Sequence, residues 1–215
     1  METGLGGVNG HSPGWFHTVM KTQNYFRNQS VVDESKVAGG AEVSLAFPAP
    51  HSYLRGANRG GFSSSMLTAK QVQELFRLQP LQPEGGYFAE TYRSPLSTAI
   101  YYMLTPDTFS AMHRLKGDET YHFYLGDPVE MLMLKPDGSA EALLLGQNVT
   151  AGMRVQHTVP GGTWQGSRLA PGGKFALMGT TMAPGFDPKD YEAGQRDALG
   201  AQYPAYAPLI AFLTR

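Results

Sequence analysis

Residues 109–126 read Phe-Ser-Ala-Met-His-Arg-Leu-Lys-Gly-Asp-Glu-Thr-Tyr-His-Phe-Tyr-Leu-Gly. Apolar and polar side chains alternate on both sides of the central Lys-Gly-Asp turn, and this period of two predicts two neighbouring β-strands. In the second strand Glu119 shares a face with Tyr121 and Phe123, whereas His122 points to the other face. A carboxylate on an inward face is costly unless it is paired or ligated, so Glu119 indicates a lined cavity rather than a dry core.

The same strand pattern continues on both sides of this stretch, with turn signals such as Pro136-Asp-Gly138 between the strands. Thr68 and Gln71 form a capping-box pattern that predicts a short helix before the first strand, and weaker helix signals lie at 192–199 and 208–213. Because no helical pattern separates the strands, the fold class is all-β, a sandwich or barrel. The predicted strands are 87–92, 99–104, 109–115, 119–125, 129–134, 140–145, 154–159 and 174–182.

Composition excludes several classes of function. Seventeen basic and eighteen acidic residues leave a net charge of -1, so we expect no nucleic-acid and no membrane-surface binding. The absence of cysteine excludes disulfides, thiolate metal sites and thiol catalysis. The sequence has no long apolar run and no signal-peptide pattern, so we expect a cytoplasmic protein, with an organelle left open by the N-terminal segment.

The composition changes near Met66. Residues 1–65 contain glycine clusters, a run of three serines and few apolar side chains, with one strand-like piece at 43–47. Such a segment cannot easily offset its own ordering entropy, so we expect an irregular or disordered extension over 1–65 and a folded domain over 66–215. His11, His17 and His51 fall in the extension and are interpreted as solvated loop residues.

His113 precedes Glu119 by six residues across the turn, so the two side chains can meet on neighbouring strands. An imidazole and a carboxylate serve equally as an acid–base pair or as two metal ligands. The alternative is that Glu119 only pairs with Arg114 or Lys116 at the end of the sheet. His157 can share the inner face or be a partnered core histidine.

A second cluster is Val159-Pro-Gly-Gly-Thr-Trp-Gln165, in which a tight turn precedes an indole ring and an amide. Trp164 and Gln165 suit stacking on a ligand and hydrogen bonding to its polar groups. The alternative is that Trp164 closes the end of the barrel.

These clusters carry a resemblance to a known family. From Met66 onward the chain resembles the cupin superfamily, and within it the DUF985 (Cupin_5) family. The resemblance implies a double-stranded β-helix, or jelly roll, with a ligand pocket at the barrel mouth and a homodimer as the common assembly. The matching stretches are 85–93, 97–102, 109–114, 118–126, 159–166 and 183–187.

The general cupin motifs are only partly kept. His113, Glu119 and Gly126 match the first motif, but Ala111 and Gln165 stand where two further histidines belong. Two of the four usual metal ligands therefore remain, so the resemblance implies no certain cofactor. His113, Glu119 and Gln165 with waters could hold a weakly bound Mn, Fe, Ni or Zn ion.

Three functions are compatible with this pattern. The first is a metal-independent isomerase or epimerase in which His113 is the base, Glu119 orients it, and Tyr121 or Tyr102 is the acid, by analogy of fold with nucleotide-sugar epimerases. The second is a metal-dependent oxygenase, lyase or isomerase, and the third is a binding module without catalysis. In each case the ligand is a small polar molecule, a sugar or a carboxylate, and the expected binding residues are Tyr102, Trp164, Gln165 and Arg93.

Overall fold

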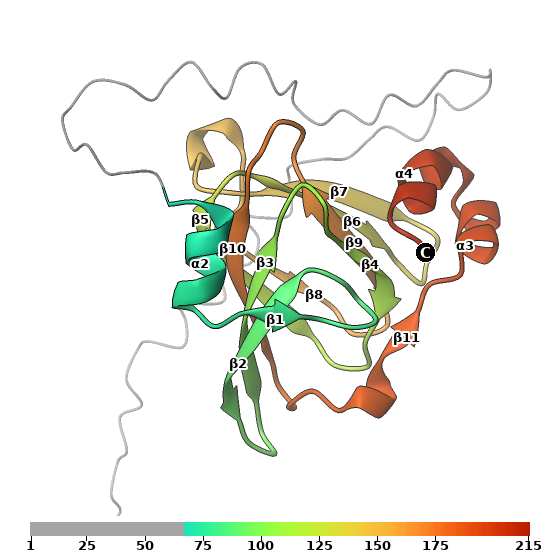
Figure 1. Cartoon of the computed structure of the whole chain (residues 1–215). Helices are drawn as coiled ribbons and strands as arrows, with labels where there is room; N and C mark the ends of the chain where they lie inside the picture. Colours follow the sequence, from blue (N-terminus) through green and yellow to red (C-terminus); the bar gives the residue numbers. More distant parts are fainter. Residues whose placement is uncertain (1–66) are drawn as a thin grey trace, which may run out of the picture. The chain divides into compact units, whose positions relative to one another are not determined.

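The computed structural model describes residues 67–215, which form two antiparallel sheets that face each other (Figure 1). The first sheet has the order β1-β2-β3-β10-β5-β8 and the second the order β11-β4-β9-β6-β7. The strands are β1 (Gln79–Pro80), β2 (Tyr87–Arg93), β3 (Thr98–Leu104), β4 (Phe109–Arg114), β5 (Glu119–Gly126), β6 (Val129–Leu134), β7 (Ala140–Leu145), β8 (Gln156–Val159), β9 (Trp164–Leu169), β10 (Ala176–Met182) and β11 (Glu192–Ala193).

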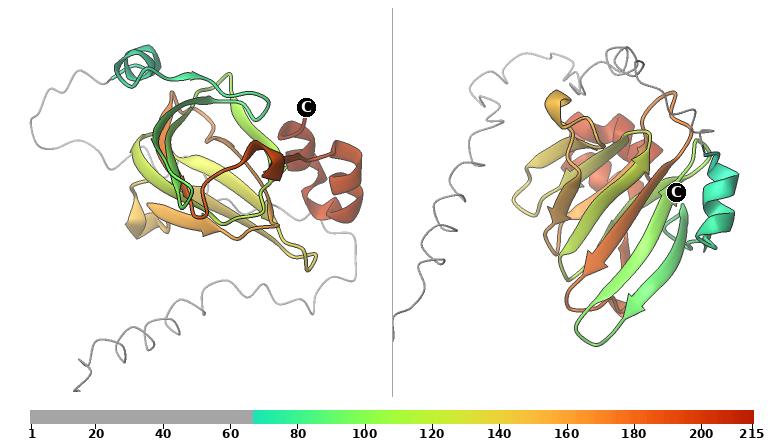
Figure 2. Two further views of the ribbon diagram at one scale, coloured as in Figure 1. Left: turned by 90° about the horizontal axis from the view of Figure 1, so that it is seen from below. Right: turned by 90° about the vertical axis from the view of Figure 1, so that its left-hand side faces the viewer.

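The chain crosses repeatedly between the two sheets, so strands that are adjacent in sequence often lie in different sheets (Figure 2). The all-β sandwich predicted from the strand pattern is confirmed, and so is the jelly roll that the resemblance implied. The main core fills the space between the sheets with apolar side chains from both of them, among them Tyr102, Tyr121, Phe123, Met131 and Met178. Burial of these side chains is the main stabilising term of the barrel.

Short helices cover the outer faces of the sheets. Helix α2 (Ala69–Leu75) begins at the predicted capping box of Thr68 and Gln71, and its Val72 packs against Met103 and Leu177 of the six-stranded sheet. The C-terminal helices α3 (Arg196–Gln202) and α4 (Ala207–Phe212) cover the five-stranded sheet. Three single 3₁₀ turns complete the structure: η4 (Val149–Ala151), η5 (Pro188–Asp190) and η6 (Pro204–Tyr206).

The structure adds one strand, β9, that was not predicted, and it moves the start of three predicted elements. The helix predicted at 192–199 begins only at Arg196, because Glu192–Ala193 pairs with β4 as strand β11. The predicted strands that begin at residues 154 and 174 begin at Gln156 and Ala176. Beyond these differences, the predicted strands and both terminal helical regions are confirmed.

The expected extension over residues 1–65, with its strand-like piece at 43–47 and its three histidines, lies outside the described residues. Within the described part, no helix combines the length and apolar character needed to span a lipid bilayer.

Candidate functional site

A cavity of about 320 Å³ opens at the end of the barrel where β3 and β5 begin and β10 ends. Most of its wall is apolar, but three glutamates, Glu84, Glu90 and Glu119, and two threonines also line it. This size lies at the lower end of the range of about 300–1,000 Å³ that small-molecule sites occupy. The lining residues are Leu81, Glu84, Phe88, Glu90, Arg93, Thr98, Ile100, Leu115, Glu119, Thr180, Met182 and Phe186.

Glu119 is the first residue of β5 and is only 8% exposed. Its Oε2 accepts hydrogen bonds from the Gln165 amide at 2.7 Å and from the Tyr121 hydroxyl at 3.2 Å. Burial, and next the negative charge of Glu84, raise the pKa of Glu119 above its ordinary value, while His113 partly opposes the shift. The expected alternative, an ion pair with Arg114 or Lys116, does not form, because these two bind Glu192 and Asp190.

His113 lies beside Glu119 but behind the cavity wall. On β4 it is paired in register with Gln165, and its side chain is 1% exposed. Its Nδ1 lies 2.8 Å from the carbonyl oxygen of Ala111, so Nδ1 carries a hydrogen and donates it. Nε2 lies 3.3 Å from the amide nitrogen of Gln165 and 3.9 Å from Glu84 Oε2. The ring of Tyr191 stacks on the imidazole, with the two ring centroids 5.3 Å apart.

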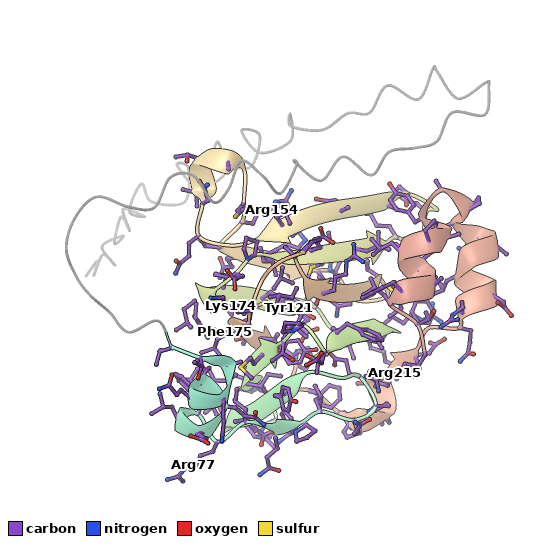
Figure 3. The ribbon with its side chains drawn as sticks, turned by 45° about the horizontal axis from the view of Figure 1, so that its top comes forward. Arg77, Tyr121, Arg154, Lys174, Phe175 and Arg215 are labelled. Atoms are coloured by element: carbon purple, nitrogen blue, oxygen red, sulfur yellow. The ribbon has the colours of Figure 1, made fainter. Side chains whose placement is uncertain are left out.

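Glu84 is the site residue that the sequence did not reveal. It sits in the loop between β1 and β2, where its Oε1 accepts a 2.7 Å hydrogen bond from the Ser110 hydroxyl. Two hydrogen bonds fix the backbone of this loop, because the Glu84 carbonyl accepts from the Ala111 amide at 2.9 Å and from the Arg215 guanidinium at 3.3 Å. Arg215 is labelled in Figure 3. Gly85 follows with φ +108°, and a Cβ there would collide with the Phe109 carbonyl. A single acidic residue in a Pro-Glu-Gly-Gly turn was the only signal in the sequence.

Tyr102 and Tyr121 close the inner end of the site. Both are almost fully buried, and Figure 3 shows Tyr121 between the two sheets. The Tyr102 hydroxyl donates to the Gly85 carbonyl at 3.0 Å, and the Tyr121 hydroxyl donates to Glu119. Burial, followed by the nearby carboxylates, raises the pKa of both phenols well above the ordinary value, so both remain protonated.

Arg93 lies in the cavity wall, whereas Trp164 lies outside it. Arg93 lines the cavity, where it binds Glu90 through two of its nitrogens and donates from Nη1 to the Phe186 carbonyl at 3.0 Å. Trp164 does not line the cavity, which corrects our expectation. Because alternate residues of a strand face opposite sides, β9 sends Gln165 inward and Trp164 outward, against the C-terminal helices and under the guanidinium of Arg114.

Of the remaining expected site residues, Tyr102, His113, Tyr121 and Gln165 form a hydrogen-bonded layer directly behind the cavity wall. His122 lies on the outer side of its strand, as expected, beside Gln156 and Thr181. His157 faces inward, where it is paired in register with Tyr121, and its ring contacts Met133 and Arg154.

The residues do not fit a divalent metal ion. Within residues 67–215, no group of three histidine or carboxylate side chains comes together as a metal site. The amide nitrogen of Gln165 contacts both His113 Nε2 and Glu119 Oε2, so its hydrogens point at the two atoms that would have to bind a cation. This arrangement gives no support to the Mn, Fe, Ni or Zn ion considered from the sequence.

Comparison with known proteins places this site in a family. The uncharacterized protein YML079W of Saccharomyces cerevisiae is 29% identical, and the match covers 60% of this chain and 78% of the yeast protein. The crystal structure of protein SO0799 from Shewanella oneidensis has a TM-score of 0.65 and 32% identity, covering 70% of this chain and 99% of that one. A hypothetical protein from Leishmania major has a TM-score of 0.65 and 30% identity, covering 69% and 99%.

The family model described as Cupin superfamily (DUF985) matches residues 70–194, which is more than half of the chain. The matched range contains the cavity, its three glutamates and the layer of polar side chains behind them. Together with the jelly roll, this match shows that the chain belongs to the DUF985 family of the cupin superfamily.

Proposed function

We propose that the cavity binds a small hydroxylated molecule such as a sugar, and that Glu119 transfers a proton on it without a metal. The observation that carries the proposal is the placement of Glu119. It is a buried carboxyl group on the cavity wall, with a raised pKa and with hydrogen bonds from Tyr121 and Gln165 that fix its orientation. A base is most effective when its pKa lies near the working pH, and burial moves a carboxyl group in that direction.

The reaction class that suits this group is isomerisation next to a carbonyl. Glu119 takes a proton from the carbon beside the carbonyl, and the C–H electron pair moves through the new C=C bond to make an enolate oxygen. Glu119 then returns the proton to the former carbonyl carbon, while the proton of the neighbouring substrate hydroxyl passes to the enolate oxygen. All atoms and charges balance, and no oxidant or reductant is needed.

Tyr121 and His113, the acid and base expected for a two-base epimerase, do not face each other across the cavity. An epimerase must return the proton from the opposite face of the substrate, which requires a second group across the cavity. Tyr121, the expected acid, instead lies two residues from Glu119 on the same strand and donates to it. His113 also lies behind the wall and reaches Glu119 only through the Gln165 amide. We therefore assign His113, Gln165 and Tyr121 as positioning residues.

The test is proton exchange with solvent. Aldoses and ketoses are incubated with the protein in D₂O, and NMR measures deuterium at the carbon beside the carbonyl. We expect exchange by the wild type and its loss in Glu119→Gln, with Glu74→Gln on the exposed side of α2 as the matched control. Ligand-induced thermal stabilisation without exchange would show a binding module instead, and unchanged exchange in Glu119→Gln would remove Glu119 from the mechanism.

A further inference from the structure

Most hydrogen-bond donors at the inner end of the cavity are already used, and the hydroxyls of Thr98 and Thr180 are the neutral side-chain donors among the lining residues. The Tyr102 hydroxyl is used by the Gly85 carbonyl, His113 Nδ1–H by the Ala111 carbonyl, and the Ser110 hydroxyl by Glu84. The Tyr121 hydroxyl and the Gln165 amide nitrogen are both directed at the same oxygen of Glu119.

Acceptors, in contrast, are in excess. Glu84 and Glu119 both face the cavity and together offer four carboxylate oxygens. Two of these oxygens already accept hydrogen bonds, Glu84 Oε1 from Ser110 and Glu119 Oε2 from Tyr121 and Gln165. The other two oxygens can only accept when the groups are ionised, so this end of the barrel is suited to a ligand that brings donors.

The charges of the lining residues also favour a cationic ligand. Arg93 is the one cationic side chain among the lining residues, and two of its nitrogens are bound to Glu90 while a third donates to Phe186. The Glu90–Arg93 pair is thus neutral as a unit, which leaves Glu84 and Glu119 without a cation in the cavity wall. A ligand carboxylate or phosphate would meet these two acids with no basic group free to receive it.

We infer that the ligand carries a protonated amino group, which is bound by Glu84 and Glu119, the two lining carboxylates that Ser110 and Gln165 hold in place. An ammonium group supplies three donors for the carboxylate oxygens and one positive charge, and the lining residues offer no unpaired cation of their own. The apolar wall, which includes Phe88, Ile100 and Phe186, then covers the rest of the molecule. The ligand class is a small hydroxylated amine, such as an amino sugar.

This inference rests on the proposed function and refines its substrate class. A positive charge beside the reacting carbon makes its proton more acidic and stabilises the enolate that forms. The ligand itself would therefore supply the electrostatic stabilisation that the described lining residues do not provide.

The test compares three probes of nearly equal shape, namely glucosamine, glucose and glucuronate, by calorimetry with the full chain at pH 7.5. We expect glucosamine to bind at least tenfold tighter than glucose, and glucuronate to bind at least tenfold more weakly than glucose. Glu84→Gln should reduce the glucosamine-to-glucose affinity ratio at least fivefold, and Glu74→Gln should leave it as in the wild type.

Equal or tighter binding of glucuronate by the wild type would overturn the inference without any variant, and would leave the proposed sugar site standing. Equal affinities for glucose and glucosamine would also overturn the inference and leave the proposed sugar site standing. Binding of none of the three probes would overturn both the inference and the proposed function.

Discussion

His157 should make the protein less stable in mild acid. Arg154 Nη1 lies 2.9 Å from His157 Nδ1, and His157 Nε2 lies 3.1 Å from the sulfur of Met133. Because the guanidinium can only donate, Nδ1 must accept, and the ring is neutral with its hydrogen on Nε2. Burial is the larger cause, and the positive Arg154 the next, of a pKa lowered from 6.5 to about 4.

The magnitude follows from the two protonation states. The unfolded histidine takes up a proton near pH 6.5, whereas the folded one does so only near pH 4. The stability contributed by the neutral ring is therefore complete above pH 6.5 and is lost as the pH falls to about 4. This difference corresponds to about 3 kcal/mol, since one pKa unit is worth ~1.4 kcal/mol. Because the ring is only partly buried and solvent screens the Arg154 charge, we expect about 2 kcal/mol.

The assay is thermal unfolding of the wild type and His157→Gln between pH 7.5 and 4. The free energy above corresponds to a change of about 4–8 °C in the Tm difference between the two proteins. Taking the difference removes the effect of other titrating groups. Arg154→Gln should make this loss smaller and complete it at a higher pH, since removing the positive charge beside Nδ1 brings the folded pKa closer to the unfolded one. A Tm difference that stays constant over this range would refute the assignment of a neutral, acid-sensitive His157.

Two further predictions concern Glu119 and Trp164. Because the pKa of Glu119 is raised, the folded protein binds the carboxyl proton more tightly than the unfolded chain does. Ionised Glu119 therefore lowers the free energy of unfolding above the raised pKa, and this loss of stability disappears as the pH falls to 4.5. Glu119→Gln should therefore unfold at higher urea concentration than the wild type at pH 8.5, and the gap should close at pH 4.5; a gap that grows in acid would contradict the raised pKa. Trp164→Ala should lower stability by about 2–4 kcal/mol, because the indole packs under α3 and α4, while sugar affinity measured by calorimetry stays as in the wild type. A selective loss of affinity would place Trp164 in the site after all.

The strand alternation in the sequence predicted most of the sheet structure because it reflects a physical requirement. Each strand must place one row of side chains in the core, as Tyr121 and Phe123 do on β5. The capping box at Thr68 was equally readable, since it depends only on neighbouring residues. Both features are local in sequence, and both are confirmed.

Strand β9 was missed because its inner face is polar. Of its three inward residues only Leu169 is apolar, whereas Gln165 and Ser167 are polar, so the segment lacks the apolar alternation by which strands are recognised. The polar character comes from the site that the strand serves. Adjacent residues of a strand face opposite sides of the sheet. Trp164 and Gln165 therefore cannot both face the site.

Glu84 could not be predicted as a site residue from the sequence. Its partners Ser110 and His113 are more than 25 residues away along the chain, and only the closure of the barrel brings the β1–β2 loop onto β4. The sequence correctly indicated that Glu119 and His113 lie close to a hollow, but the order of the groups along the cavity wall depends on this long-range contact.

Hydrogen bonds connect the C-terminal end of the described chain to the site. Arg215 donates to the carbonyl of Glu84, Thr214 is held by Arg196, and the Met112 amide donates to Leu213. An affinity tag fused after Arg215 would therefore begin next to the loop that presents a site carboxylate, and could displace it through the backbone alone. Recombinant protein for ligand screening should carry a cleavable tag at the other end, and a binding constant that changes on tag removal would reveal this linkage directly.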